Sequence, residues 1–241
     1  MEVFPLFASP LVQIKVKEDI NKLNDIVNKE PFAFTKSSGS YNAQISKDRR
    51  ILERYLDLKE LLLDYFNQFS EEVLRYDGEF NITTSWFTKI KTGCSSHYHF
   101  HKNSFYSGVL YFGDYSNDNG GAIKFNNPLE QFSDYQIAPK EYYIANCNEY
   151  AVYPQKNILI IFPSYLSHMI DTYYGENPRY SLAFNIVPVG EYGRSDSKYS
   201  TNWFWSINNW KLKKMTHIRK EVTYTYYTGI SSTGLWSTDY N

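Results

Sequence analysis

The sequence contains little cysteine and no long apolar run. Its two cysteines, Cys94 and Cys147, lie far apart among 241 residues and form no C-x-x-C motif, which predicts reduced thiols. No segment approaches the roughly 18 consecutive apolar residues that a membrane helix requires. The start, "MEVFPLFASPLVQIKV", lacks the basic and apolar regions of a signal peptide. We therefore expect a cytoplasmic protein without a membrane partner.

The chain also lacks an excess of either charge, because 25 basic residues balance 26 acidic residues for a formal net charge of -1. Such a balance gives no bulk field that would attract nucleic acid. One basic stretch, "KLKKMTHIRK" at 211–220, is short and isolated, and we interpret it as a solvated patch. We expect no nucleic-acid partner.

Aromatic residues, in contrast, are plentiful. They make up 18% of the chain, and hydrophobic residues make up 42%, which is enough for one sizeable core. Apolar periodicity predicts helices at 17–29 and about 48–76, and the second helix should end at the Asp77-Gly78 pair. Short β-branched and aromatic runs predict strands. These runs lie at 7–16, 81–90, 107–112, 122–125, 141–145, 149–154, 158–162 and 180–189.

So many short strands predict a mostly β fold with flanking helices, of the sandwich or jelly-roll kind. We expect a single domain over 1–189, with helical support at about 18–76 and a jelly-roll core at about 80–189. The remaining residues, 190–241, form an aromatic-rich extension that carries three of the five tryptophans in "TNWFWSINNW". We interpret this extension as a lid or a homodimer contact.

Three of the five histidines occupy alternate positions in the run H-Y-H-F-H, namely His97, His99 and His101. Alternate residues of an extended strand face one side, so we expect these three imidazoles to point the same way. A buried histidine without a partner is costly. Three of them on one face, followed by the polar "KNS", therefore predict a metal site.

A fourth histidine, His168, begins an extended segment after the apolar run "ILIIF" and a proline turn. Arg179 follows eleven residues later (179 − 168 = 11), and Ser181 shares its face of the next strand. An arginine that faces the interior is costly unless an anion meets it, and a guanidinium can bind a carboxylate through two hydrogen bonds. We therefore predict an anion clamp beside the histidines. The alternative is that Arg179 pairs with an internal Asp or Glu.

These pieces together resemble the Fe(II)/2-oxoglutarate-dependent dioxygenase superfamily. The family signature is H-x-D/E, then a distal histidine, then an arginine about ten residues on. The sequence has "HFH", "SGVLYF", "GGAIKF", "FPSYLSH" and "RYSLAFNI" in this order, and "FPLFASPLV" near its start. The likeness is greatest to a bacterial and phage branch with H-x-H in place of H-x-D. It covers roughly 4–12 and 80–188.

This resemblance implies a double-stranded β-helix (a cupin-like jelly roll) and a hydroxylase that converts 2-oxoglutarate and O2 into succinate and CO2. It implies Fe(II) on His99, His101 and His168, with 2-oxoglutarate held by Arg179, Ser181 and Tyr111. Asn103 and Trp86 are candidate pocket residues, although Trp86 also suits a plain core position.

Several alternatives remain open at the level of the sequence. His101 stands where most relatives have a carboxylate, so it is either a ligand or a neighbour of the ligands, and His97-x-His99 is the other register. Asp114 and Asp171 are the nearest carboxylates, but neither has the i+2 spacing. The alternative functions are a jelly-roll module with structural zinc or no metal, and a three-His cupin dioxygenase that does not use 2-oxoglutarate. The substrate is either a small molecule or a peptide or protein.

Overall fold

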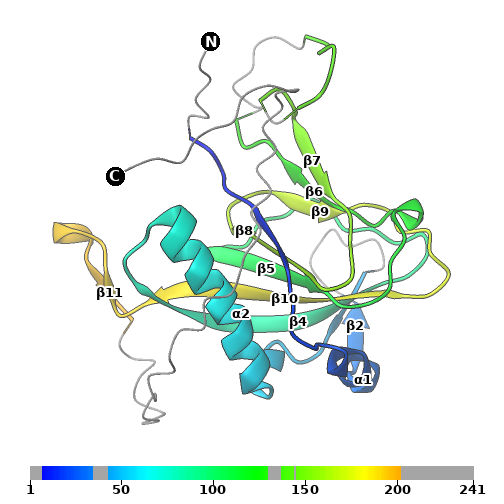
Figure 1. Ribbon diagram of the computed structural model, residues 1–241, viewed down its shortest axis with the longest axis horizontal. Helices are drawn as coiled ribbons and strands as arrows, with labels where there is room; N and C mark the ends of the chain where they lie inside the picture. The colour runs from blue at the N-terminus through cyan, green and yellow to red at the C-terminus, as the bar shows by residue number, and fades with distance from the viewer. Residues whose placement is uncertain (1–6, 35–42, 130–136, 144, 202–241) are drawn as a thin grey trace.

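The main feature of the structure is an antiparallel sheet of seven strands (Figure 1). The computed structural model describes residues 7–34, 43–129, 137–143 and 145–201. In spatial order the strands are β1 (Val12–Lys15), β8 (Ile158–Pro163), β5 (Tyr106–Tyr111), β10 (Arg179–Val189), β4 (Glu79–Ile90), β3 (Gln44–Ser46) and β2 (Phe32–Phe34). A second antiparallel sheet has the order β7 (Glu149–Val152), β6 (Ile123–Asn126) and β9 (His168–Ile170). The predicted mostly β fold with a jelly-roll core is confirmed.

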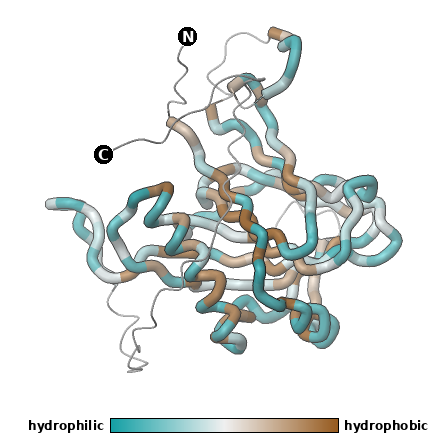
Figure 2. The backbone as a smooth tube through the Cα atoms, viewed as in Figure 1, coloured by the Kyte–Doolittle hydropathy of each residue, from teal (hydrophilic) through white to brown (hydrophobic). Residues whose placement is uncertain are grey.

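Two helices, α1 (Lys22–Lys29) and α2 (Leu56–Phe69), cover one face of the main sheet with an apolar core (Figure 1). Helix α2 buries the residues of one stripe. They are Leu58, Leu62, Tyr65, Phe66 and Phe69. Figure 2 shows that the central strands carry most of the apolar segments, whereas the peripheral loops are mostly hydrophilic. Part of the opposite face of the main sheet packs against the three-stranded sheet in a second apolar cluster.

A close contact between β5 and β10 fixes how the sheet packs on this helical layer. Gly108 lies opposite Phe184, and the Phe184 ring covers it. A Cβ at this position would come within 2.2 Å of the ring. Only glycine therefore allows Phe184 to lie flat in the core.

A bulge in β4 determines which of its side chains face the helical layer and which face the other side of the sheet. Asn185 pairs with Thr84 but Ile186 pairs with Ile82, so one residue of β4 has no partner. Side chains alternate along a strand, and an extra residue reverses the alternation. As a result both Ile82 and Phe87 reach the helical core, and Trp86 lies on the other face beside His101.

Two predictions about local structure are wrong. The segment 48–76 is not one helix, because Tyr55 has non-helical dihedral angles and separates a 3-10 turn (Ile51–Glu53) from α2, which continues into a π turn (Ser70–Leu74). The backbone N–H of Leu52 donates to Ser85 Oγ at 2.8 Å, which ties the first turn to β4 instead of to the helix.

The second wrong prediction is a strand at 141–145, since no described residue of this segment belongs to a strand. The Asn146 side chain accepts from the Tyr143 backbone N–H and donates to the Glu141 carbonyl, which closes a local turn. Strands β2 and β3 were not predicted. They form in the segment expected to be helical support.

The C-terminal extension is described only at its start, where β11 (Glu191–Tyr192) and β12 (Tyr199–Ser200) form a hairpin. The tryptophan cluster, the basic stretch 211–220 and His217 lie outside the described residues, and so does the hypothesis of a lid or dimer contact. Across the described part of the chain, no helix combines the length and the apolar character needed to span a membrane.

Candidate active site

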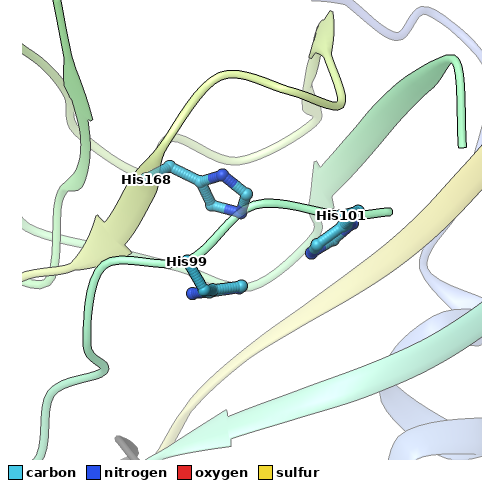
Figure 3. A group of neighbouring side chains, drawn as sticks. All are labelled: His99, His101 and His168. Atoms are coloured by element: carbon cyan, nitrogen blue, oxygen red, sulfur yellow. The ribbon is translucent and has the colours of Figure 1, made fainter. Parts of the chain in front are cut away.

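Three histidines that are distant in sequence come together between the two sheets. His99 and His101 lie on the segment before β5, and His168 begins β9 (Figure 3). One ring nitrogen of each lies within 4.8 Å of the others, and the ring centroids are 4.4 Å (His99 to His168), 5.2 Å (His101 to His168) and 5.4 Å (His99 to His101) apart. This spacing suits one shared metal ion.

The backbone of β9 positions the segment that carries His99. His99 and His168 exchange two backbone hydrogen bonds of 2.9 Å, but Ser96, not His97, donates to the Ile170 carbonyl. The three residue steps from His99 back to Ser96 therefore lie opposite the two steps from His168 to Ile170, and this extra residue disturbs the alternation of side chains. The expected regular strand with all three imidazoles on one face is wrong. His97 is exposed and does not belong to the cluster that the described residues form.

All three imidazoles of the cluster have Nδ1 within hydrogen-bond distance of an oxygen atom. Nδ1 of His99 lies 2.9 Å from the His97 carbonyl, and Nδ1 of His168 lies 2.9 Å from the Leu166 carbonyl. A carbonyl can only accept, so both rings carry their proton on Nδ1. Nδ1 of His101 lies 2.7 Å from Asn185 Oδ1. Nε2 is then the free atom, as in metal-binding histidines whose other nitrogen is hydrogen-bonded.

Burial also keeps two of these rings neutral. His168 is 5% exposed, and its desolvation, helped by the neighbouring His99, lowers its pKa to about 3. Desolvation lowers the pKa of His101 as well, against the effect of its bond to Asn185. A neutral imidazole is the form that binds a metal.

Arg179, the first residue of β10, is one of the most deeply buried side chains, with 1% exposure. Its Nη2 donates to Tyr111 Oη at 3.0 Å, and the guanidinium carbon lies 4.9 Å from the Tyr111 ring centre. Its Nε and Nη1 have no hydrogen-bond partner among the described residues. The alternative of an internal Asp or Glu partner is therefore wrong for this part of the chain.

The comparisons with known proteins agree with this arrangement. Residues 84–185 match the model of a family described as "Putative 2OG-Fe(II) oxygenase", a segment that includes the three clustered histidines and Arg179. This segment of the chain is therefore similar to the 2OG-Fe(II) oxygenase family. The cofactors of that family are Fe(II) and 2-oxoglutarate. No curated protein matches this chain.

Solved structures share the fold of this chain at low sequence identity. A prolyl-4-hydroxylase of Pseudomonas putida has a TM-score of 0.50 at 16% identity, over 75% of this chain and 94% of the other. A prolyl hydroxylase of Trichoplax adhaerens, bound to a fragment of hypoxia inducible factor, has a TM-score of 0.52 at 13% identity, over 75% and 84%. HygX of Streptomyces hygroscopicus, bound to nickel, 2-oxoglutarate and hygromycin B, has a TM-score of 0.52 at 8% identity, over 75% and 83%.

The residues of the site fit both cofactors of that family. Three imidazoles with free Nε2 atoms suit Fe(II), and the unpaired N–H groups of a buried guanidinium suit a carboxylate. On the face of β10 between Arg179 and Asn185, the side chains of Ser181 and Ala183 are small. Gly121, with φ 69°, lies close to Arg179, because a Cβ there would come within 3.3 Å of Arg179 Cδ.

The other predicted site residues occupy different surroundings. Tyr111 is fully buried beside Arg179, and Ser181 is 2% exposed on the strand that carries Arg179. The Trp86 ring centre lies 5.6 Å from that of His101, so Trp86 lines the cluster and is only partly buried. Asn103 is exposed in the turn before β5, with φ 58°.

Neither candidate carboxylate joins the cluster. Asp114 pairs with Lys156 at 2.9 Å, and Asp171 pairs with Lys124 at 3.1 Å. Sequence reasoning missed Asn185, which touches His101. The signal was available, because Asn185 continues the alternate positions Arg179, Ser181 and Ala183 along β10.

Proposed function

We propose that the protein is an Fe(II)- and 2-oxoglutarate-dependent hydroxylase, with the metal on His99, His101 and His168 and the cosubstrate on Arg179. The observation that carries the proposal is the buried Arg179, which keeps two unpaired N–H groups on the same strand that approaches the histidine cluster. A buried charge without an anion is strongly unfavourable, so a ligand that supplies a carboxylate there would relieve that cost.

When bound, Fe(II) and 2-oxoglutarate supply the oxidising chemistry, in which 2-oxoglutarate and O2 yield succinate and CO2 as the substrate gains a hydroxyl group. The histidines contribute three free Nε2 atoms, and burial lowers the pKa of His101 and His168, which keeps these two rings neutral at physiological pH. The sheets on either side exclude water from His168. This exclusion strengthens every electrostatic interaction in the site.

The clamp for the distal carboxylate of 2-oxoglutarate would use side chains of two neighbouring strands. Arg179 offers the N–H groups of Nε and Nη1, which have no partner among the described residues and can donate to a carboxylate. Tyr111 accepts from Nη2, so its own hydroxyl proton remains available to a ligand. The Ser181 hydroxyl would add a third donor from the face of β10 that carries Arg179.

The substrate would enter where the cluster is open, next to the exposed His99 and the partly buried Trp86. The Trp86 ring would form an apolar wall against the carbon to be hydroxylated, with Asn103 at the rim. Structures of similar fold have been solved with a peptide fragment and with hygromycin B. A peptide and a small molecule are therefore both candidate substrates. Free Cys94 and Cys147 suit a reducing compartment such as the cytoplasm.

The number of histidines and the buried Arg179 argue against the two other functions. A structural zinc site has four protein ligands, and the cluster among the described residues has three. A three-His dioxygenase without 2-oxoglutarate has no need of a buried arginine with two free N–H groups.

The decisive experiment is an anaerobic titration of the Fe(II)-loaded protein with 2-oxoglutarate, followed by visible absorption. We expect a weak metal-to-ligand band in the parent protein and none in Arg179→Ala. Arg50→Ala, which changes an exposed arginine, is the matched control and should keep the band. No band in the parent protein would contradict the proposed function. A band that survives His101→Ala but is lost in His97→Ala would show that the other histidine register is correct.

A further inference from the structure

His101 differs from the other two histidines of the cluster in how its Nδ1 is held. Main-chain carbonyls hold His99 and His168, but the partners of His101 are the side chains Asn185 (Oδ1 at 2.7 Å) and Ser107 (Oγ at 3.0 Å). A carbonyl fixes the proton on Nδ1 without ambiguity, whereas a side-chain amide can present either oxygen or nitrogen. The chemical state of His101 therefore depends on Asn185.

Asn185 is itself fixed by neighbours on both adjacent strands. Its Nδ2 donates to Thr84 Oγ1 of β4 at 2.9 Å, and its Oδ1 accepts from Ser107 Oγ of β5 at 2.9 Å. The bulge of β4 next to this pair gives Thr84 its place on the site face. Asn185 is thus clamped across three strands, with its oxygen toward His101.

A row of serines continues the network behind Ser107. Ser107 Oγ lies 2.8 Å from Ser164 Oγ, and Ser164 donates to Ser104 Oγ at 2.8 Å. Ser104 donates to the main-chain carbonyls of Tyr106 and Ile186. The backbone of the same loop is also tied down, because the His101 N–H donates to the Ser164 carbonyl at 2.9 Å. A network of this kind restricts rotation of its members.

We propose that Asn185 is a positioning residue. Its Oδ1 accepts a hydrogen bond from His101 Nδ1–H and thereby holds the ring as the tautomer whose Nε2 lone pair faces His99 and His168. The proposal rests on the proposed function, in which His101 is a metal ligand. In a flipped orientation, the Asn185 amide nitrogen would donate to Nδ1, and the proton would move to Nε2. His101 could not bind a metal in that state.

Asn185 also bears on the missing carboxylate of the H-x-D signature. A ligating histidine becomes a stronger donor when an oxygen accepts from its other nitrogen, and most strongly when that oxygen is a carboxylate. The neutral amide of Asn185 supplies such an oxygen behind the imidazole that replaces the carboxylate. Asn185→Asp should therefore preserve the function of this residue, and Asn185→Ala should remove it.

The tautomer can be measured directly in the metal-free protein. Long-range proton–nitrogen NMR correlations of a sample with 15N-labelled histidine, at pH 8 where imidazole is ordinarily neutral, distinguish Nδ1–H from Nε2–H. The signals of His101 are assigned by their loss in His101→Gln. We expect Nδ1–H in the parent and in Asn185→Asp, and a mixture in Asn185→Ala. Nε2–H in the parent would overturn the proposal, and this result needs no variant at Asn185.

Metal affinity provides the second measurement, with Co(II) alone as the probe. We expect Asn185→Ala to weaken Co(II) binding by about 10- to 100-fold, and Asn185→Asp to bind at least as tightly as the parent. Asn81→Ala, an asparagine of β4 opposite Val187, is the matched control and should bind like the parent. Unchanged affinity in Asn185→Ala would also refute the proposal. If the tautomer and Co(II) results hold but no 2-oxoglutarate band forms, the proposed function fails and the role of Asn185 stands.

Discussion

Strand β10 presents two different sets of side chains to the two faces of the main sheet. Toward α2 it places Leu182, Phe184 and Ile186, all of which are completely buried in the apolar core. Toward the histidine cluster, the alternate positions are polar or small. They are Arg179, Ser181, Ala183 and Asn185.

The difference separates stability from function within a single strand. Burial of hydrocarbon on the helix face stabilises the fold, by about 25 cal/mol per Å² removed from water. The site face contains a buried guanidinium with two unpaired N–H groups, which opposes folding until a ligand binds. Substitutions on the two faces should therefore change different measured quantities.

The largest effect on stability is expected at the helix face, for Phe184→Ala. The ring contacts Gly108 and lies in the main core, so its loss leaves a cavity that glycine cannot fill. We expect the free energy of unfolding to fall by about 3–5 kcal/mol, as measured by urea denaturation. At low temperature, where the variant stays folded, its Co(II) affinity should match that of the parent. A loss of metal affinity in the folded variant would show that the two faces are coupled.

The opposite result is expected at the site face, for Arg179→Met. Methionine has a similar length and no charge, so it removes a buried cation that lacks an anion. We expect the protein without metal or 2-oxoglutarate to become more stable, by up to about 1–4 kcal/mol in the same urea assay. A loss of more than about 1 kcal/mol would mean that Arg179 has a stabilising partner without any ligand.

The sequence was sufficient to predict the residues that local periodicity controls. Alternation placed Arg179 and Ser181 on one face, and the apolar run before Pro163 predicted the buried strand that leads to His168. The same alternation, extended by two steps, predicts Asn185 beside them. That residue was missed because an isolated asparagine gives no chemical signal until its histidine partner is known.

Features that depend on contacts between distant segments could not be predicted. The H-Y-H-F-H run suggested three equivalent histidines. Its pairing with β9 contains one extra residue between Ser96 and His99, and His97 lies outside the cluster. Similarly, periodicity predicted a single helix at 48–76. In the structure the Leu52 backbone N–H donates to Ser85 Oγ of β4, and the first turn is separate from the helix. Local patterns contain no information on such bonds.

A smaller effect is expected from pH, through His168 on the site side. Its pKa of about 3 in the folded protein lies below the ordinary imidazole value of about 6.5, so the unfolded chain binds more protons between these values. The stability of the metal-free protein should be complete above about pH 6.5 and fall as the pH decreases toward 3. The slope from this histidine is at most about 1.4 kcal/mol per pH unit.

Urea denaturation at pH 5, 6 and 7, in the presence of a chelator, measures this slope. The variant His168→Asn removes the titrating group, so its stability should depend less on pH than that of the parent, whatever its stability at pH 7. Equal slopes in both proteins would show that His168 is not kept neutral by burial. The core of the helix face contributes no titrating histidine in this range among the described residues, so Phe184→Ala should keep the parent slope.

The smallest effect is expected for Ser181→Ala, again on the site face. This change removes one hydroxyl donor from the clamp proposed for 2-oxoglutarate and leaves Arg179 and Tyr111 in place. One hydrogen bond contributes about 0.5–1.5 kcal/mol, so 2-oxoglutarate should bind about 2- to 12-fold more weakly to the Fe(II)-loaded protein, as measured from its visible band.

A buried serine outside the clamp provides the control for this change. Ser46 Oγ accepts from the Phe87 backbone N–H at 3.0 Å and donates to the Asp48 carbonyl at 2.8 Å, so Ser46→Ala leaves a buried donor unpaired. We expect that variant to lose about 1–3 kcal/mol of stability and to bind 2-oxoglutarate like the parent. Ser181→Ala should show the reverse, with unchanged stability and weaker binding. If Ser181→Ala instead lowers stability and leaves binding unchanged, Ser181 belongs with the residues that support the fold, and the clamp consists of Arg179 and Tyr111 alone.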